Sequence, residues 1–128
     1  MSPTDRLRPP PEDRLAAPVQ LIDLPESTAK LRQEPHNPVA GHRQIAVFRH
    51  GPVTLVSFAF EAHGHLKEHK ADGVVTILAL SGHLRVVAED EPYDLRAGHV
   101  LALAPNVVHS VVALTSSEML LTVHKGVT

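Results

Sequence analysis

Residues 63–82, HGHLKEHKADGVVTILALSG, begin with the side chains in this sequence that are best suited to chemistry. His63, His65, Glu68 and His69 fall within seven residues, and imidazole nitrogens and carboxylate oxygens are the commonest protein donors to divalent cations. The segment then becomes a continuous aliphatic run that is typical of a strand. Which histidine points inward therefore depends on the strands that position it.

The composition limits the classes of function. A chain of 128 residues with 43% hydrophobic content fits one domain with a modest core. The formal net charge of −2, from 12 basic and 14 acidic side chains, provides no basic surface, so we expect no nucleic-acid partner. The absence of cysteine excludes disulfides, thiolate metal sites and cysteine nucleophiles.

The first 20 residues lack the apolar region of a secretory signal, and no apolar run reaches the ~18–20 residues needed to span a bilayer. We therefore expect a cytoplasmic protein without a membrane partner. The ten histidines would change the formal charge from −2 to +8 if all were protonated, since −2 + 10 = +8. A pH sensor is conceivable on this ground, although histidines scattered over an exposed surface are the simpler interpretation.

Eight of the eleven prolines lie in residues 1–38, which excludes strand interiors and long helices there. We expect a proline-rich, partly disordered arm over residues 1–39, mobile over residues 1–16, and a β-barrel domain over residues 40–128. Within the arm, residues 18–24 could pair at a sheet edge. Residues 25–34 carry a helix signal, with Pro25 early.

From about residue 40 the sequence consists of short β-branched runs, separated by turn residues every 8–12 positions. This pattern predicts an all-β sandwich or barrel of antiparallel strands. The expected strands cover residues 43–50, 53–61, 65–70, 74–80, 83–89, 92–95, 100–104, 109–114 and 119–124.

The order and spacing of these strands and turns resemble the cupin family, whose members are jelly-roll barrels of two antiparallel sheets. The resemblance covers residues 40–125. Cupins carry two motifs, G-x5-H-x-H-x3,4-E-x6-G and G-x5-P-x-G-x2-H-x3-N, whose three histidines and glutamate usually bind a divalent metal. The resemblance implies a small, RmlC-like cupin.

Aligning the closing glycine of the first motif with Gly82 puts the glutamate position at Val75, the second histidine at Ala71 and the first at His69. The opening glycine position falls on a histidine. Only one of the three ligands of this motif is therefore present.

In the second motif, Gly98 matches the opening glycine and His109 matches the histidine. The proline position is Ala104, and the last position is Ala113. Asn106 replaces the inner glycine, and asparagine is the residue that most readily adopts a positive φ in its place. The resemblance thus implies a degenerate metal site that keeps two of four ligands, His69 and His109.

A competing register reads His63-Gly64-His65 as the H-x-H element, with Glu68 following. The glutamate would then lie fourteen residues before Gly82 instead of seven. Such a shift would place a turn inside the unbroken run 74–80, so we favour the first register. In it His63 and His65 are exposed, and the roles of His83 and His124 stay open.

The favoured register predicts a pocket inside the barrel, lined by His69, Ala71, Val75, Ile77 and His109. Carbon at positions 71 and 75 suits a small apolar or aromatic ligand whose polar end meets a histidine. His69 and His109 alone would hold iron, manganese, nickel or zinc weakly, unless a side chain such as His83 or His124 completes the shell. The catalytic residues stay unknown. One histidine could act as a general base without a metal, but the sequence supplies no nucleophile. It supplies no substrate-anchoring arginine either, since Arg43, Arg49 and Arg85 on the expected strands are expected to be solvated.

Three functions stay open: a cupin that binds a small molecule, a metal-dependent cupin enzyme of the dioxygenase, isomerase or decarboxylase kind, or a structural or accessory protein. A homodimer is expected in each case, because residues 43–50 and 53–61 are apolar on both alternating faces.

Overall fold

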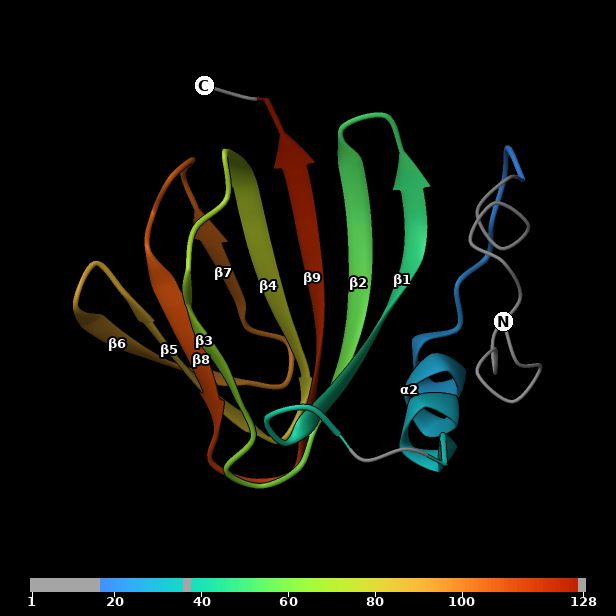
Figure 1. The fold of residues 1–128 in the computed structure, drawn as a ribbon, viewed down its shortest axis with the longest axis horizontal. Helices are drawn as coiled ribbons and strands as arrows, with labels where there is room; N and C mark the ends of the chain where they lie inside the picture. Colours follow the sequence, from blue (N-terminus) through green and yellow to red (C-terminus); the bar gives the residue numbers. More distant parts are fainter. Residues whose placement is uncertain (1–16, 36–37, 127–128) are drawn as a thin grey trace.

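The computed structural model describes residues 17–35 and 38–126, which form one helix and nine strands (Figure 1). The expected strands agree with the observed ones to within two residues at each end. The elements are α2 Leu24–Gln33, β1 His42–His50, β2 Val53–Phe60, β3 His65–His69, β4 Gly73–Ser81, β5 His83–Ala88, β6 Glu91–Arg96, β7 Val100–Leu103, β8 His109–Ala113 and β9 Ser117–Lys125.

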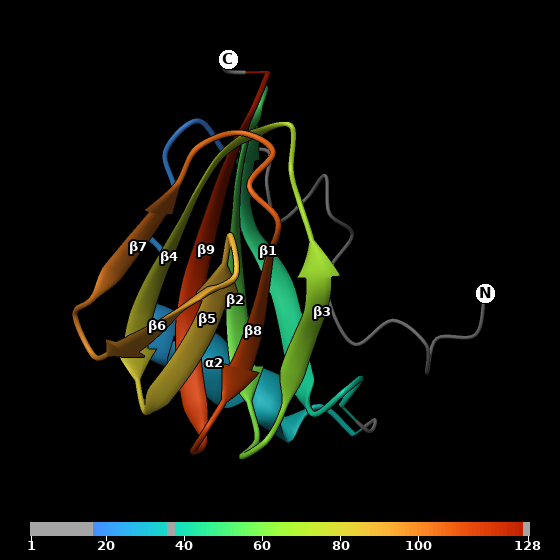
Figure 2. The same cartoon turned by 90° about the vertical axis from the view of Figure 1, so that its left-hand side faces the viewer.

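The strands form two antiparallel sheets that face each other, as Figures 1 and 2 show. The five-stranded sheet has the order β1-β2-β9-β4-β7, and the four-stranded sheet has the order β3-β8-β5-β6. The last strand, β9, lies at the centre of the larger sheet between β2 and β4. This is the jelly-roll arrangement, and the all-β expectation is confirmed.

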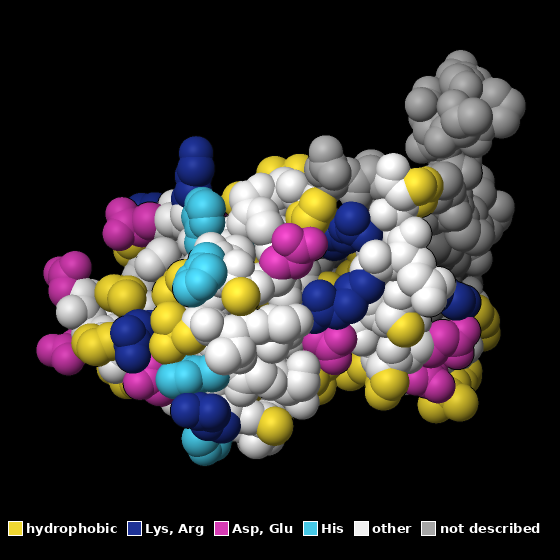
Figure 3. Space-filling view, turned by 90° about the horizontal axis from the view of Figure 1, so that it is seen from below, with side chains coloured by type: hydrophobic (Ala, Val, Ile, Leu, Met, Phe, Trp, Pro, Cys, Tyr) yellow, Lys and Arg dark blue, Asp and Glu magenta, His cyan; other side chains and the backbone are white. Residues whose placement is uncertain are grey.

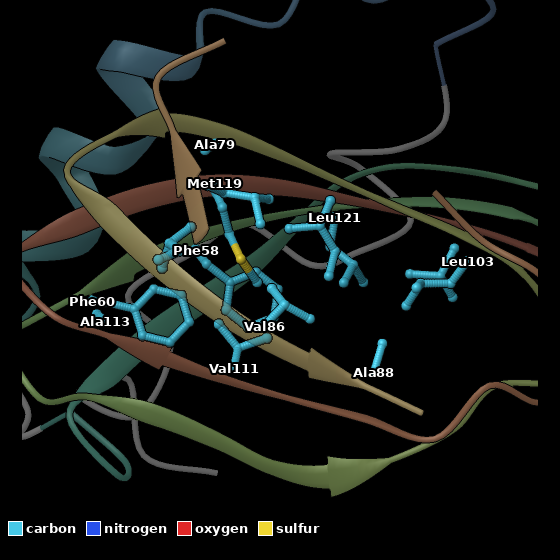
Figure 4. Close-up of a cluster of buried hydrophobic side chains, with 14 residues drawn as sticks. Phe58, Phe60, Ala79, Val86, Ala88, Leu103, Val111, Ala113, Met119 and Leu121 are labelled. Carbon is cyan, nitrogen blue, oxygen red and sulfur yellow. The ribbon is translucent and has the colours of Figure 1, made fainter. Parts of the chain in front are cut away.

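Alternation along the strands separates an inner from an outer face. In β4, Val75, Ile77 and Ala79 are buried, while the residues between them are only partly so. The inner side chains of both sheets meet in one apolar cluster, part of which is labelled in Figure 4. Burial of this cluster is the main stabilising contribution to such a domain.

Tight turns join the strands at residues that tolerate a positive φ. Gly82 has φ +80 between β4 and β5, and a Cβ there would clash with Ser117. Asn106 has φ +65 in the loop between β7 and β8, which confirms the expectation that asparagine keeps this turn. Its backbone N–H donates to the carbonyl of Ala71 at 2.8 Å, so the loop is joined to the one between β3 and β4.

Asp23 caps the N-terminus of helix α2, because its side chain accepts a hydrogen bond from the N–H of Glu26 at 3.0 Å. Pro25 lies in its first turn, as the sequence predicted, and is favourable there because the first N–H groups of a helix have no partner within it. Thr28 and Leu31 are buried, and they pack the helix on the outer face of β1 and β2.

Two arginines join α2 to the barrel. Arg43 donates from Nη1 to the carbonyls of Leu31 and Arg32, both at 2.8 Å, and so satisfies carbonyls at the helix C-terminus. The expectation that Arg43 is solvated was wrong, because the docked helix partly buries it. Arg32 in turn donates to the carbonyls of Phe60 and Ser117, at 3.3 and 3.2 Å.

The segment before α2 does not pair as a strand, contrary to the expectation for residues 18–24. Its described link to the sheet is a side-chain bond, in which Gln20 Nε2 donates to the carbonyl of Val47 at 2.7 Å. Val47 lies where the β1–β2 register shifts, so the backbone is irregular at this place. The expectation for residues 1–16 concerns residues outside those described, and the division at residue 39 stays a prediction.

No helix among the described residues has the length and apolar character needed to cross a membrane.

Candidate functional site

His69 and His109 lie opposite each other on the neighbouring strands β3 and β8. His109 begins β8, where alternate residues are buried, and it shares the inner face with Val111 of the core. A register shift between Leu66 and His69 brings His69 into line with His109. The centroids of the two imidazoles are 4.3 Å apart, with the ring planes tilted by 58°.

The two histidines differ in exposure. His109 is 1% exposed, whereas His69 is an exposed residue at the end of its strand. Burial lowers the pKa of His109, the nearby His69 lowers it further, and a hydrogen bond to the backbone of Val107 opposes both effects. Burial therefore favours the neutral form of the His109 imidazole.

The same end of the barrel carries apolar side chains that are only partly buried. We call His69, Ala71, Val107, His109 and Val123 the open-end cluster. Val123 pairs with Val75 across β9 and β4, and the chain from His69 passes through Ala71 directly into the start of β4. Chain connection and strand register therefore bring these residues to one end of the barrel.

The remaining expected pocket residues lie below this cluster. Val75 is 3% exposed and Ile77 is fully buried, and both belong to the apolar core. Of the five residues assigned to the pocket from the sequence, His69, Ala71 and His109 thus lie at the open end, and Val75 and Ile77 lie in the apolar core beside it.

The other histidines of interest do not join the pair. His63 lies in the turn between β2 and β3, with φ +70, and His65 at the start of β3 is exposed. His83 faces Asp94, with 3.4 Å between Nε2 and Oδ1, and exposed His124 lies near the end of β9. Figure 3 shows further histidine side chains (cyan) on the surface of the opposite end of the barrel.

The described part of the chain contains no group of three or more histidine and carboxylate side chains that could hold a metal ion. The competing register would require His63, His65 and Glu68 to form such a group, and they do not. Completion of the His69 and His109 pair by His83 or His124 is likewise not observed. His69 and His109 are therefore the two imidazoles that the fold brings together at the candidate site.

One buried histidine was not identified from the sequence. His42, at the start of β1, is 8% exposed and lies against Phe58 and Phe60, with ring centroids 5.6 and 5.4 Å away. Its Nδ1 donates to the carbonyl of His65 at 3.0 Å, which joins the first strand of one sheet to the first strand of the other. Residues 42–46 show no regular alternation of polar and apolar side chains, so no local signal indicated that His42 is buried.

The comparisons with known proteins agree with this arrangement. The family model described as the AraC-like ligand binding domain matches residues 50–121, more than half of the chain. No protein with a curated function matches the sequence.

Several solved structures share the fold. A cupin superfamily protein from Desulfitobacterium hafniense has a TM-score of 0.66 at 18% identity, over 88% of this chain and 95% of that chain. An RmlC-like cupin from Shewanella frigidimarina has a TM-score of 0.64 at 17% identity, over 68% of this chain and 78% of that chain. Salicylate 1,2-dioxygenase from Pseudaminobacter salicylatoxidans has a TM-score of 0.64 at 16% identity, over 77% of this chain and 31% of that chain. At these identities the similarity concerns the cupin fold, and with the matching family model the chain belongs to the AraC-like ligand binding domains.

Proposed function

We propose that this protein binds a small molecule at the open end of its barrel, beside His69 and His109. The observation that carries the proposal is the buried Nε2 of His109, which has no hydrogen-bond partner among the described residues. Leaving a buried polar atom without a partner costs about 1–3 kcal/mol, so such an atom in a native fold calls for an explanation. A ligand that reaches this nitrogen past exposed His69 would provide one.

The surroundings favour an apolar ligand body. Ala71, Val107 and Val123 are partly exposed carbon surfaces, and they pack against the buried apolar core. Binding sites of this kind combine apolar walls with a few polar groups that fix the orientation. Membership in a family of ligand binding domains supports the same function.

The donor set does not fit a tightly held resident metal ion. The two imidazoles bring no negative charge, and the third and fourth cupin ligand positions are carbon, at Ala71 and Val75. Two neutral ligands leave the rest of a coordination shell to water. We therefore propose that the metal site is largely lost, and we derive no catalytic step through iron, manganese, nickel or zinc.

Metal analysis of the purified protein, together with a thermal-shift screen of small aromatic and aliphatic compounds, tests this function. We expect well under one metal ion per chain, and an increase in melting temperature with a subset of the compounds. One equivalent of a transition metal that survives dialysis would contradict the loss of the metal site. A screen in which no compound stabilises the protein would contradict ligand binding.

We also propose that two copies of the chain associate through the outer face of the five-stranded sheet. Two adjacent cross-strand rows on this face contain no charged side chain. One consists of Leu55, Thr122, Thr76 and Ala102, and the other of Leu120, Leu78 and Val100 beside the fully buried Ser57. Helix α2 covers only the end near β1 and β2. A second copy is the favoured occupant, because an uncharged face can pack on itself about a two-fold axis without charge repulsion.

Light scattering at micromolar concentration should give twice the chain mass of 13.9 kDa. Leu120→Lys should shift the protein toward monomer, because it places a charge in the middle of the row. Val87→Lys is the matched control, since Val87 is 37% exposed on the other sheet. A single-chain mass for the unmodified protein at every concentration would rule the dimer out.

A further inference from the structure

The two histidines at the open end are oriented by the same local contact. Nδ1 of His69 lies 2.8 Å from the carbonyl oxygen of Lys67, and Nδ1 of His109 lies 3.0 Å from that of Val107. In each case the partner is the carbonyl two residues earlier in the chain. A carbonyl oxygen only accepts hydrogen bonds, so each Nδ1 must carry the hydrogen. In the neutral ring, Nε2 is then left with a lone pair and no hydrogen.

The two histidines therefore present acceptors, not donors, at this end of the barrel. Nε2 of His109 is buried and unpartnered, and the ring of His69 lies beside it with 4.3 Å between centroids. Neither imidazole makes an ion pair with a carboxylate among the described residues. His69 is exposed, so its Nε2 can accept a hydrogen bond from water, whereas the buried Nε2 of His109 needs a group that donates.

This requirement separates the chemical classes of ligand. A carboxylate offers only acceptor oxygens and would bring its lone pairs and charge against the two nitrogens. A hydrocarbon would cover the partly exposed carbon surfaces and leave Nε2 of His109 without a partner. A neutral hydroxyl supplies the missing hydrogen, and the aromatic body of a phenol matches the partly exposed carbon surfaces of Ala71, Val107 and Val123.

We propose that the ligand is a neutral hydroxyl compound with an apolar body, of which phenol is the simplest aromatic case. The proposal rests on the proposed function, since it names the class of ligand for the same site. The hydroxyl donates to Nε2 of His109, and the ring covers the open-end cluster. His69 lines the exposed side through which the ligand enters.

Three probes that share one aromatic ring test this class. Phenol, toluene and benzoate are titrated into the full chain by NMR at pH 8 with EDTA present, where an ordinary imidazole is neutral and a phenol is still protonated. We expect phenol to bind at least tenfold more tightly than toluene, and benzoate to give no saturable shift. The shifted signals should come from residues of the open-end cluster.

Variants then test which histidine accepts the hydrogen bond from the phenol hydroxyl. His109→Leu should abolish the preference, so that phenol and toluene bind equally. His69→Leu, at an exposed position where folding is not at risk, should weaken phenol binding by a smaller factor. His65→Leu is the matched control, because His65 lies on the same strand β3 with its side chain exposed on the opposite face, and it should leave phenol binding unchanged.

The outcomes distinguish the ligand class from the function itself. Benzoate binding more tightly than phenol, or toluene binding equally in the unmodified protein, would overturn the hydroxyl class while ligand binding stands. Phenol binding that appears only when zinc replaces EDTA would mean that the histidines hold a cation. That result would also overturn the hydroxyl class. If none of the three probes binds while the compound screen still finds a ligand, the hydroxyl class is overturned and ligand binding stands. If the screen also finds none, the proposed function fails as well.

Discussion

The two ends of the barrel interior share β8 and β9 but are packed differently. At one end Phe58, Phe60, Leu84, Ala113 and Met119 are each at most 3% exposed, and the rings of Phe58 and Phe60 are stacked with centroids 5.8 Å apart. At the other end the open-end cluster mixes partly buried carbon with two imidazoles. The five side chains of the first end carry only carbon and sulfur, whereas the second end holds the buried Nε2 of His109, which has no hydrogen-bond partner among the described residues.

This difference is consistent with the proposed function, in which one end stabilises the fold and the other binds the ligand. A closely packed interior loses free energy when any atom is removed, whereas a polar atom left unpaired lowers stability and is retained where it meets a ligand. The following predictions test whether the two ends respond to substitution in opposite ways.

The largest effect is expected at the packed end. Phe60→Ala should lower the free energy of unfolding by about 3–5 kcal/mol, because Phe60 is fully buried and its removal leaves a cavity. Urea denaturation measures the change. Val108→Ala, at a side chain that is 40% exposed, is the control and should change it by much less. A loss of less than about 1 kcal/mol for Phe60→Ala would show that this end is not closely packed.

The next effect concerns Ala71 and Val75, the two carbon positions of the metal site that we propose to be largely lost. The double variant Ala71→His and Val75→Glu should lose about 1–3 kcal/mol through overpacking, because both side chains grow and Val75 is 3% exposed. With His69 and His109 it would supply three imidazoles and one carboxylate, so nickel or zinc should raise its melting temperature by binding the folded state.

Two controls accompany this variant. The unmodified protein should respond much less to the same metal, and adding His109→Ala should remove the gain. Equal, strong responses of parent and variant would show that the parent already holds a complete metal site, and no response in either would show that the alignment on Gly82 is wrong.

A smaller effect is expected when the unpaired imidazole itself is removed. His109→Leu should change the free energy of unfolding by no more than about 1 kcal/mol, because the loss of the Nδ1 bond to Val107 is offset by removal of a buried, unpartnered nitrogen. Urea denaturation alongside Phe60→Ala makes the comparison direct. A loss as large as that of Phe60→Ala would mean that both ends are packed in the same way.

The smallest effect is a dependence of stability on pH. Because the pKa of His109 is lowered in the folded protein, the unfolded chain takes up a proton at a higher pH than the folded one. The contribution of neutral His109 to the free energy of unfolding should therefore be complete above the ordinary imidazole pKa of about 6.5. It should decrease as the pH drops below that value. Chemical denaturation between pH 8 and pH 5.5 checks this, and His109→Leu should show a weaker dependence over the same range.

Much of the fold could be predicted from the sequence, because the features that specify it are local. The run 74–80 predicts β4, and Asn106 indicated a turn at positive φ. The pairing of His69 with His109 followed from the cupin motif spacing, since motif residues keep their register on the strands.

Prediction from the sequence failed where tertiary contacts decide the burial or pairing of a residue. Arg43 is partly buried because a helix twelve residues earlier docks on the sheet and offers it two carbonyls, which no local pattern indicates. Residues 18–24 have a suitable composition for a strand, but the described hydrogen bond to the sheet comes from the Gln20 side chain and not from the backbone. The unpaired state of His109 Nε2 is likewise a property of the packed barrel and not of its sequence motif.

The place of β9 has a consequence for the order in which the protein can assemble during synthesis. Because this final strand lies between β2 and β4, the larger sheet has a gap at its centre until residues 117–125 have left the ribosome. Helix α2 depends on the same strand, since Arg32 bonds to the carbonyl of Ser117 across 85 positions of the chain. Contacts between such distant segments form late and slowly. The earlier strands must therefore wait with their apolar faces uncovered, and the nascent chain should need protection from aggregation until its last strand is made.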